Sequence, residues 1–329
     1  MRLAMIGTGG IVKEALTALK DVPSITCQAI WAREHSLEKA RNLANEYHIL
    51  QVYTNYEALL AADDIDFVYI GLVNSAHYAF ARQALLAGKH VIVEKPFAST
   101  RKETKELLTL AQEKHLYLFE AVTLLHMPNF RAVQKNLAEI GNVKMVQCNY
   151  SQYSSRYASY RQGKVLPAFD PALSGGALYD INVYNLQFVI GLFGSPAHVQ
   201  YIANKGFNGI DTSGILLLQY DHFAAVCVGA KDSASDGHLI IQAEEGTIYG
   251  QGAPNELRSL VVTKKDQQAL IEENCYAHRM VHEFISFADI YARKDYACCL
   301  KYMQITEQVM AVLEEARKQA GISFPADTL

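Results

Sequence analysis

Residues 2–12 of the chain read RLAMIGTGGIV, and this stretch decides the fold. The apolar run 2–6 predicts a β-strand, the glycines predict a tight turn, and the residues that follow, to about Lys20, predict a helix. A strand, a glycine-rich turn and a helix in this order direct backbone N–H groups and the positive end of a helix dipole at a pyrophosphate. The segment therefore predicts the first βα unit of a dinucleotide-binding sheet.

The turn itself supplies the first expected cofactor contacts. Gly7 permits the tight turn, and Gly9 lets a cofactor approach the backbone. We expect contacts from Gly7, Thr8, Gly9, Gly10 and Ile11. The third glycine of the usual fingerprint is replaced by Val12, which predicts looser packing of the helix on the strand. The alternative interpretation is a tight turn with a purely structural role.

The end of the second predicted strand bears on the choice of cofactor. NAD enzymes usually carry Asp or Glu about 20 residues after the glycine turn, where it binds the ribose hydroxyls. Here residues 29–33 read AIWAR, with no acid before Glu34. Arg33 could bind a 2′-phosphate, so NADP(H) is favoured and NAD(H) remains possible. The alternative is that Arg33 is a solvated loop residue.

The length of 329 residues exceeds that of a usual single core, so we expect two domains. Over residues 1–120 the strand-like runs 26–31, 67–72, 90–94 and 117–120 alternate with helical segments, which predicts a parallel Rossmann sheet. Thr100 and Glu103 have the spacing of a capping box. Residues 121–329 contain longer strand-like runs at 145–153, 214–220, 223–229 and 238–243, and a helix at about 304–320. Only Asp221-His222 separates the second and third of these runs, which predicts an antiparallel hairpin. The predicted fold class is α/β, with a Rossmann domain and a second α/β domain built on an open sheet.

Composition restricts the partners and the compartment. Half of the residues are hydrophobic, 19% are charged and the formal net charge is −4, which argues against a protein that neutralises nucleic-acid phosphates or coats a membrane. The chain shows neither a signal-peptide pattern nor a run of ~20 apolar residues, so we expect a cytoplasmic protein. The six cysteines are scattered without zinc spacing, and no metal site is expected.

Two further segments carry candidate catalytic side chains. The predicted strand 90–94 ends in Glu94-Lys95-Pro96, at the edge where open α/β sheets bind ligands. A lysine there could donate to a reacting oxygen and stabilise negative charge on it, although a lone lysine after a strand is more often a surface charge. Residues 174–184 read SGGALYDINVY and predict a glycine-rich helix start with Asp180 and Tyr184 on one face, four residues apart. A solvated helix face is the alternative for this pair.

These motifs resemble those of the glucose-fructose oxidoreductase, inositol dehydrogenase and rhizopine-catabolism family, abbreviated Gfo/Idh/MocA, over nearly the full length. The matching positions are Gly7 and Gly9, residues 68–71 with Asn74 and His77, Glu94-Lys95-Pro96, Glu120-Ala121 with Pro128, and Gly175-Gly176 with Asp180.

The resemblance implies a Rossmann domain followed by a mainly antiparallel α/β domain that binds substrate and commonly dimerises through its open sheet. It implies that Lys95 is catalytic and that Asp180 contacts substrate. Many members carry an acid/base histidine at the position of Tyr184. The tyrosine variant resembles glucose-fructose oxidoreductase and the dimeric dihydrodiol or xylose dehydrogenases, which implies a catalytic role for Tyr184 and again favours NADP(H). Further cofactor contacts are expected from Leu72, Asn74, His77, Glu94, Lys95 and Pro96.

Two departures from the family pattern concern the substrate pocket. Asn182 replaces a common glycine, and Leu125, next to His126, replaces an arginine, which predicts a less polar pocket. The predicted function is NAD(P)-dependent hydride transfer to or from a sugar, polyol or dihydrodiol-like molecule, in a homodimer or dimer of dimers with no nucleic-acid or membrane partner. The alternatives are a catalytically silent sensor of dinucleotide or sugar, and a biliverdin-reductase-like enzyme.

Overall fold

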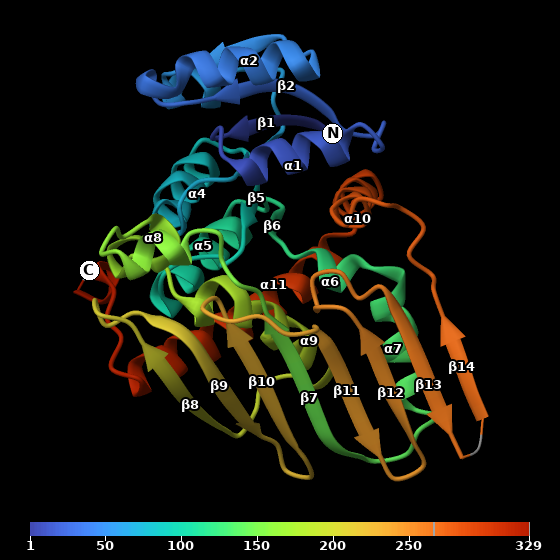
Figure 1. The fold of residues 1–329 in the computed structure, drawn as a ribbon. Helices are drawn as coiled ribbons and strands as arrows, with labels where there is room; N and C mark the ends of the chain where they lie inside the picture. The colour runs from blue at the N-terminus through green and yellow to red at the C-terminus, as the bar shows by residue number, and fades with distance from the viewer. Residues whose placement is uncertain (266, 329) are drawn as a thin grey trace. The chain divides into compact units, whose positions relative to one another are not determined.

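The computed structural model describes residues 1–265 and 267–328, and the chain divides into two compact units. The first unit contains Met1–Ala121 and His278–Thr306. The second contains Val122–Ala277 and Glu307–Leu329. A later part of the chain therefore returns to complete the N-terminal unit, including helix α10 (Val281–Ala292), which is labelled in Figure 1.

Six parallel strands form the sheet of the first unit, in the order β3-β2-β1-β4-β5-β6. Their bounds are β1 (Arg2–Ile6), β2 (Thr26–Trp31), β3 (Gln51–Tyr53), β4 (Phe67–Ile70), β5 (His90–Glu94) and β6 (Leu118–Ala121). All four residues of β4 are buried, as expected for a strand covered on both faces. The strand order reverses between β1 and β4, and open α/β sheets bind their ligands at the carboxyl ends of the strands beside such a point.

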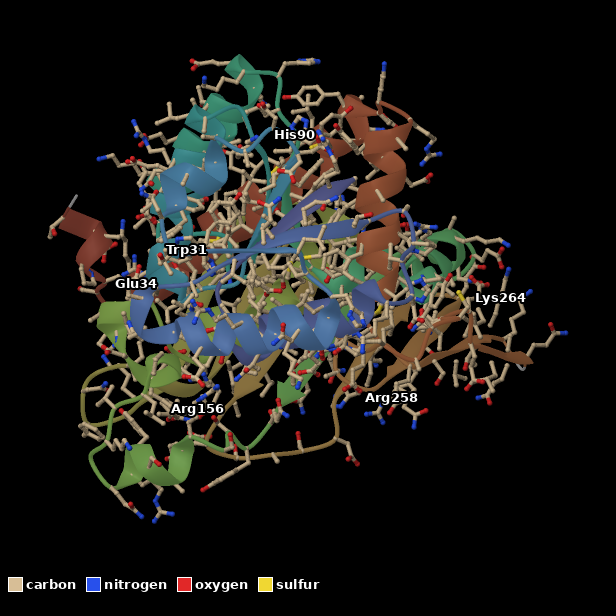
Figure 2. All side chains as sticks on the ribbon, turned by 90° about the horizontal axis from the view of Figure 1, so that it is seen from above. Trp31, Glu34, His90, Arg156, Arg258 and Lys264 are labelled. Carbon is tan, nitrogen blue, oxygen red and sulfur yellow. The ribbon has the colours of Figure 1, made fainter. Side chains whose placement is uncertain are left out.

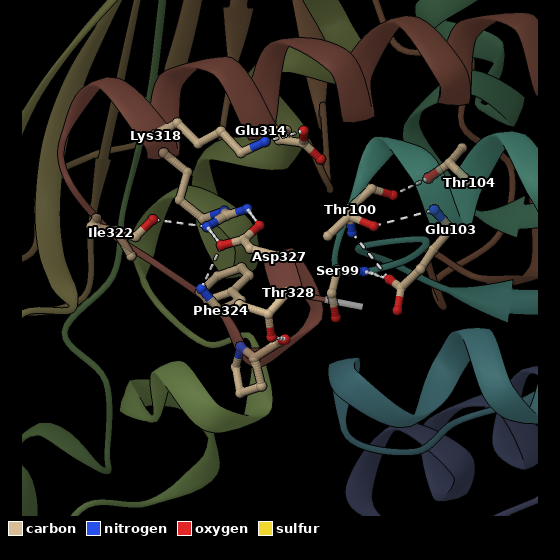
Figure 3. Close-up of polar contacts among 12 residues, drawn as sticks. Ser99, Thr100, Glu103, Thr104, Glu314, Lys318, Ile322, Phe324, Asp327 and Thr328 are labelled. Carbon is tan, nitrogen blue, oxygen red and sulfur yellow. Dashed lines mark hydrogen bonds and ion pairs between the residues drawn. The ribbon is translucent and has the colours of Figure 1, made fainter.

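Helices connect these strands and cover the sheet. They are α1 (Gly10–Leu19), α2 (Leu37–Tyr47), α3 (Tyr56–Leu60), α4 (His77–Leu86) and α5 (Arg101–Glu113), with short 3₁₀ turns η1 (Glu34–Ser36) and η2 (Asn74–Ala76). The predicted capping box at the start of α5 is confirmed. The Thr100 hydroxyl accepts from the Glu103 N–H at 3.2 Å, and the Glu103 carboxylate accepts from the Thr100 N–H at 3.1 Å (Figure 3).

Eight strands form the sheet of the second unit, in the order β14-β13-β12-β11-β7-β10-β9-β8. Their bounds are β7 (Val143–Ser151), β8 (His198–Lys205), β9 (Asp211–Gln219), β10 (Ala224–Ala230), β11 (His238–Ala243), β12 (Gly246–Gln251), β13 (Ser259–Lys264) and β14 (Gln267–Ile271). The β7–β10 pair is parallel and the other pairs are antiparallel, including the predicted β9–β10 hairpin. The predicted fold class, a Rossmann sheet with a second, mainly antiparallel open sheet, is confirmed.

The two faces of this second sheet differ. Helices α7 (Pro128–Leu137) and α9 (Val183–Phe193) pack against one face, α9 on β7 and β10 and α7 on β13 (Figure 1). Side chains alternate along β9, so that Leu216 and Leu218 are buried while Ile215 and Leu217 are exposed. The same alternation leaves several large apolar side chains exposed on the other face.

The C-terminal segment supports the element that carries Asp180. Arg317 lies on helix α11 (Tyr296–Gln319) and is almost fully buried. Its guanidinium donates to Asp327 at 2.5 and 2.7 Å and to the carbonyl of Ile322 at 2.8 Å (Figure 3). Phe324 packs edge-on against Tyr179, with ring centroids 5.0 Å apart. Tyr179 lies in η5 (Leu178–Asn182), next to Asp180.

Some elements differ from the predicted ones. The three-residue β3 and the strands β8, β12, β13 and β14 have no counterpart among the predicted strands. The last long helix begins at Tyr296, about two turns before the predicted start near residue 304. No helix within the described residues is long and apolar enough to span a membrane.

Candidate active site

The glycine turn lies at the carboxyl ends of β1 and β4. The N–H of Gly7 donates to the carbonyl of Trp31 at 2.9 Å, and that of Gly71 donates to the carbonyl of Ile6 at 3.0 Å. Gly7 has a φ of +117°, and a β-carbon there would come within 2.6 Å of the Gly71 carbonyl oxygen. Both the backbone conformation and the close approach therefore require glycine at position 7.

Val12 packs closely against the end of β4. It is completely buried, and a β-carbon on Gly71 would lie 2.7 Å from its Cγ2 atom. The looser packing predicted from the missing third glycine is therefore wrong. The glycine that allows helix and strand to pack closely is Gly71, which follows β4, and not a residue of the helix.

The start of α1 fits the pyrophosphate of a dinucleotide. Gly9 is its N-cap and has no side chain to satisfy the first N–H groups, and the first turn contains no acidic residue. Added β-carbons on Gly9 and Gly10 would meet nothing within 4 Å. An anion can thus approach N–H groups that carry the positive end of the helix dipole.

The turn after β2 has the features of a cofactor-selecting turn. Trp31, the last residue of β2, is held by a 2.9 Å hydrogen bond from its indole N–H to the carbonyl of Thr54. Arg33 and Glu34 follow and are exposed; Figure 2 labels Trp31 and Glu34, on either side of this turn. The arginine therefore lies after the strand where a ribose-binding acid would usually stand.

His77 links the ends of β4 and β5. Its Nδ1 lies 2.9 Å from the carbonyl oxygen of Pro96 and its Nε2 lies 3.2 Å from that of Leu72. Burial lowers the pKa of His77 to about 4, so the ring is neutral at pH 7 and donates to one of these oxygens at a time. The Leu72 side chain in turn lies next to Gly7. Four of the residues expected to contact the cofactor, Gly7, Leu72, His77 and Pro96, are thus joined at one edge of the sheet.

Glu94 and Lys95 end β5 and differ in exposure. The Glu94 carboxylate is buried, accepts a hydrogen bond from the Tyr69 hydroxyl, and accepts one from the backbone N–H of Lys95 at 3.2 Å. Burial raises the pKa of Glu94. Lys95 is partly exposed. The carboxylate is therefore engaged inside the unit, while Lys95 is partly exposed at the carboxyl end of β5. Of the other expected contacts, Thr8, Ile11 and Asn74 are also partly exposed.

In the second unit, a buried carboxylate organises the glycine-rich segment. Gly176 has a φ of +106°, and a β-carbon on it would clash with the carboxylate of Asp211. That carboxylate accepts from the Leu178 N–H at 2.6 Å and from the Tyr201 hydroxyl at 2.7 Å. Asp211, the first residue of β9, thus caps the start of η5. Residue 176 must be glycine because the Asp211 carboxylate occupies the place of a β-carbon.

Asp180 forms a strong ion pair that the sequence did not indicate. Its Oδ2 atom lies 2.5 Å from the Nζ of Lys231, whose side chain is only 2% exposed, whereas that of Asp180 is 32% exposed. Lys231 directly follows β10, a position that usually indicates a surface charge. No periodic pattern connects it to Asp180, because η5 and β10 are brought together only by folding.

Tyr184 and Asn182 lie on the buried side of the same region. Residues Leu178–Asn182 form a π-helical turn, after which α9 begins at Val183; the sequence predicted an ordinary helix start. Tyr184 is 7% exposed and packs on Tyr150 with ring centroids 5.7 Å apart. Asn182 donates to the carbonyl of Cys227 at 3.2 Å and lies against Gly229, where a β-carbon would come within 2.9 Å of it.

The second departure from the family pattern lies in the core of the second unit. Leu125 is buried in helix α6 (Thr123–His126), and a β-carbon on Gly191 would lie 2.8 Å from its Cδ2 atom. Burial lowers the pKa of the neighbouring His126 to about 3, so this ring is neutral. An apolar side chain and an uncharged ring therefore stand where the family pattern would place an arginine.

Protein-family models match most of the chain. Residues 1–122 match the model for the GFO/IDH/MocA oxidoreductases with an NAD-binding Rossmann fold, and residues 130–250 match that for the GFO/IDH/MocA C-terminal domain.

Curated relatives and solved structures agree with these matches. The chain is 34% identical to the scyllo-inositol 2-dehydrogenase (NADP(+)) of Bacillus subtilis (strain 168), with 99% of each chain covered. It is 26% identical to the trans-1,2-dihydrobenzene-1,2-diol dehydrogenase of Xenopus tropicalis, covering 96% of this chain and 97% of the relative. A 3-ketoreductase from Actinomadura kijaniata, solved with NADP and TDP-benzene, has a TM-score of 0.82 at 22% identity over 97% of both chains, which shows a shared fold.

Proposed function

The chain belongs to the GFO/IDH/MocA oxidoreductase family, as its motifs predict, and on this premise we propose that it is an NADP(H)-dependent dehydrogenase of polyols. The reaction oxidises a secondary hydroxyl group to a ketone and releases one proton. The reverse reaction reduces the ketone.

The position of Lys95 is the observation that carries this proposal. It follows the last residue of β5, and Pro96 beside it is linked through His77 to Leu72 at the end of β4. The glycine turn lies at the same edge of the sheet. An ammonium group carried at this edge is suited to donate to the oxygen of a substrate held beside a bound dinucleotide.

Each proposed catalytic group has one task. A nicotinamide, when bound, supplies the acceptor for the hydride of the substrate carbon. The Lys95 ammonium donates to the substrate oxygen and stabilises its developing negative charge. Tyr184 exchanges the hydroxyl proton of the substrate: its phenolate accepts this proton when the alcohol is oxidised, and its phenol donates it when the ketone is reduced. The Asp180 carboxylate accepts from a neighbouring hydroxyl and fixes the face that the substrate presents.

Two observations favour NADP(H) over NAD(H). The turn after β2 lacks the ribose-binding acid and offers the exposed Arg33 for a 2′-phosphate. The relative from Bacillus subtilis is named as NADP(+)-dependent.

The proposed substrate class is a cyclic polyol, with the inositols as first candidates. The same relative is named for scyllo-inositol, and the dehydrogenase from Xenopus tropicalis is named for a cyclic diol. The ion pair of Asp180 with Lys231 offers a polar contact for hydroxyl groups. Leu125 stands where the family pattern has an arginine. Without that arginine, substrates with a carboxylate or phosphate group are disfavoured.

The test is turnover followed through the absorbance of reduced nicotinamide, with inositols, other polyols, sugars and dihydrodiols as substrates. Lys95→Met and Tyr184→Phe should each lower kcat by about 10² to 10⁴-fold. NADP(H) should still protect both variants against thermal unfolding, because neither change alters the glycine turn. The exposed residues Lys114 and Tyr153 supply matched controls, Lys114→Met and Tyr153→Phe, which should keep wild-type turnover. Near-normal turnover in either catalytic variant would remove that residue from the mechanism.

The same assay separates the alternatives. A sensor would bind cofactor tightly and turn over no substrate. A biliverdin-reductase-like enzyme would act on a broad apolar substrate with which polyols do not compete.

We further propose a homodimer that forms through the open face of the second sheet. One row of paired residues crosses this face from β9 to β14 and includes Leu217, Ile240, Tyr249 and Leu270. Three of them, Leu217, Tyr249 and Leu270, are 40 to 66% exposed. The other members of the row are partly exposed and, apart from Gln147, apolar. Exposed apolar side chains gathered in this way mark interfaces in water-soluble proteins.

A reducing, cytoplasmic compartment is part of the proposal. Cys148 and Cys227 are register neighbours on β7 and β10, both are buried, and all six cysteines are free thiols. Adjacent thiols without a disulfide are usual where glutathione keeps cysteines reduced.

A further inference from the structure

We propose that Lys231 is a positioning residue, which fixes the Asp180 carboxylate as the acceptor for a substrate hydroxyl group next to the reacting carbon. This inference rests on the proposed function. It assigns a role in discriminating among polyols to Lys231, which is not one of the residues that we propose to contact the substrate.

Lys231 is fixed at both ends. Its backbone N–H donates to the carbonyl of Thr212 at 2.8 Å, which continues the pairing of β10 with β9. At the other end, Nζ donates to Asp180 at 2.5 Å and to the carbonyl of Ala168 at 2.9 Å, and lies 4.7 Å from the ring centre of Phe169. The ammonium group therefore has little freedom to move.

The same contacts connect the lysine to the glycine-rich turn before Asp180. The carbonyl of Ala168 accepts from the Gly176 N–H at 3.1 Å as well as from Lys231. A β-carbon on Gly175 would come within 2.7 Å of the Pro167 carbonyl oxygen. Lys231 thus ties together the end of β10, the turn η3 (Pro167–Phe169) and the start of η5.

Two carboxylates balance the buried charge, and they are suited to different tasks. Burial raises the pKa of Asp211 while Lys231 lowers it, and Asp211 is committed to Leu178 and Tyr201. Asp180 is directly paired with the lysine, and about a third of its side chain is exposed. Of the two, Asp180 is therefore the one that can reach a substrate while the lysine holds its orientation.

A carboxylate held in one orientation discriminates between substrates. A substrate with a hydroxyl group at the right place replaces water on Asp180 and gains a charge-assisted hydrogen bond. A deoxy analogue leaves the carboxylate without that partner. Without Lys231, Asp180 would lose its fixed direction, and the preference for the hydroxyl would fall.

The kinetic test compares a polyol with its deoxy analogue in Lys231→Met. We expect KM for the polyol to rise by about 10- to 100-fold, with a much smaller change for the analogue and little change in kcat. Lys231→Gln keeps an N–H donor without the charge and should fall between wild type and Lys231→Met. Lys205→Met is the matched control, because Lys205 also donates to a backbone carbonyl, that of Ala320 at 2.8 Å, on an exposed edge.

A second measurement does not depend on turnover. Asp180→Asn leaves a buried ammonium without its counter-ion, so the denaturant midpoint should fall strongly; the double variant Asp180→Asn/Lys231→Met removes the stranded charge and should recover part of the loss. Additive effects of the two changes would overturn the proposal, because the residues would then not act as a pair.

The outcomes separate this inference from the proposed function. If wild type turns over no polyol, the proposed function fails, and a coupled unfolding cycle still supports Lys231 as the residue that positions Asp180. If polyols are turned over and KM values for polyol and analogue rise equally in Lys231→Met, the pair is only structural and the inference is overturned.

Discussion

Val12 on α1 and Gly71 after β4 occupy a single packing position: the valine is fully buried, and a β-carbon on the glycine would lie 2.7 Å from its Cγ2 atom. We expect Gly71→Ala to lower the free energy of unfolding by about 1–3 kcal/mol, the usual cost of overpacking. Val12→Ala in the same chain makes room for the new methyl group. Denaturant unfolding should therefore show that the double variant loses less than the sum of the single losses. Additive losses would mean that the two residues do not share the position.

This relationship also marks a limit of reasoning from sequence. The glycine fingerprint, the strand runs and the hairpin at residues 221–222 are local patterns, and they predicted the fold class. Looser packing of α1 on the sheet was predicted, and this was wrong. The space for the Val12 side chain is provided by Gly71, which is about 60 residues away in the chain and adjacent only in the fold. Asn182 and Gly229 repeat the arrangement in the second unit.

The missed elements have similar causes. Strand β3 has three residues, all half-buried, and is too short for an apolar period. In β14 nearly every side chain is exposed, so it has no hydrophobic pattern. The π-helical turn at Leu178–Asn182 depends on backbone hydrogen bonds that no residue type signals.

Some candidate site residues belong to local sequence motifs, and others are brought to the site only by folding. Lys95 and Asp180 lie within motifs and could be proposed from the sequence. Lys231 directly follows β10 and Asp211 lies in β9, and their hydrogen-bond partners are up to 63 residues away in the chain. The buried orientation of Glu94 toward Tyr69 likewise depends on strand pairing.

Cofactor choice should depend on Arg33. If its guanidinium binds the 2′-phosphate, Arg33→Ala should raise KM for NADP(H) by about 10- to 100-fold and leave KM for NAD(H) nearly unchanged. Initial rates with each cofactor provide the measurement. Arg41→Ala, an equal loss of charge at an exposed position of α2, is the control and should change neither value. Equal effects of Arg33→Ala on the two cofactors would exclude the phosphate contact.

Association should depend on the open face of the second sheet. Leu217→Lys/Tyr249→Lys places two like charges on the row of apolar side chains that we propose as the interface, so the dimer should dissociate. Light scattering should give twice the 36.6 kDa of one chain for wild type and a single chain for the variant. The control is Leu50→Lys. Leu50 is an exposed apolar residue of the first unit, outside the proposed interface, so this change should leave the dimer intact. A dimer that persists in the double variant would place the interface elsewhere.

Stability should depend on pH through Glu283. This residue of α10 is completely buried, and neither of its carboxyl oxygens has a hydrogen-bond partner among the described residues. Burial raises its pKa well above the usual value, the charge of Glu94 raises it further, and Arg279 lowers it. The folded chain therefore holds this proton over a pH range in which the unfolded chain has released it.

The sign follows from that difference in bound protons. As pH rises above the unfolded pKa of about 4.3, the unfolded state loses the proton and gains stability relative to the folded state, until the pH passes the raised folded value. Glu283→Leu removes both the titration and the unsatisfied oxygens, and should stabilise the protein by about 1–3 kcal/mol at pH 7. The gain over wild type should shrink as pH approaches 4.5. Urea unfolding at several pH values provides the measurement, with the exposed Glu38→Leu on α2 as the control. A gain that stays constant with pH would show that Glu283 does not hold a proton in the folded state.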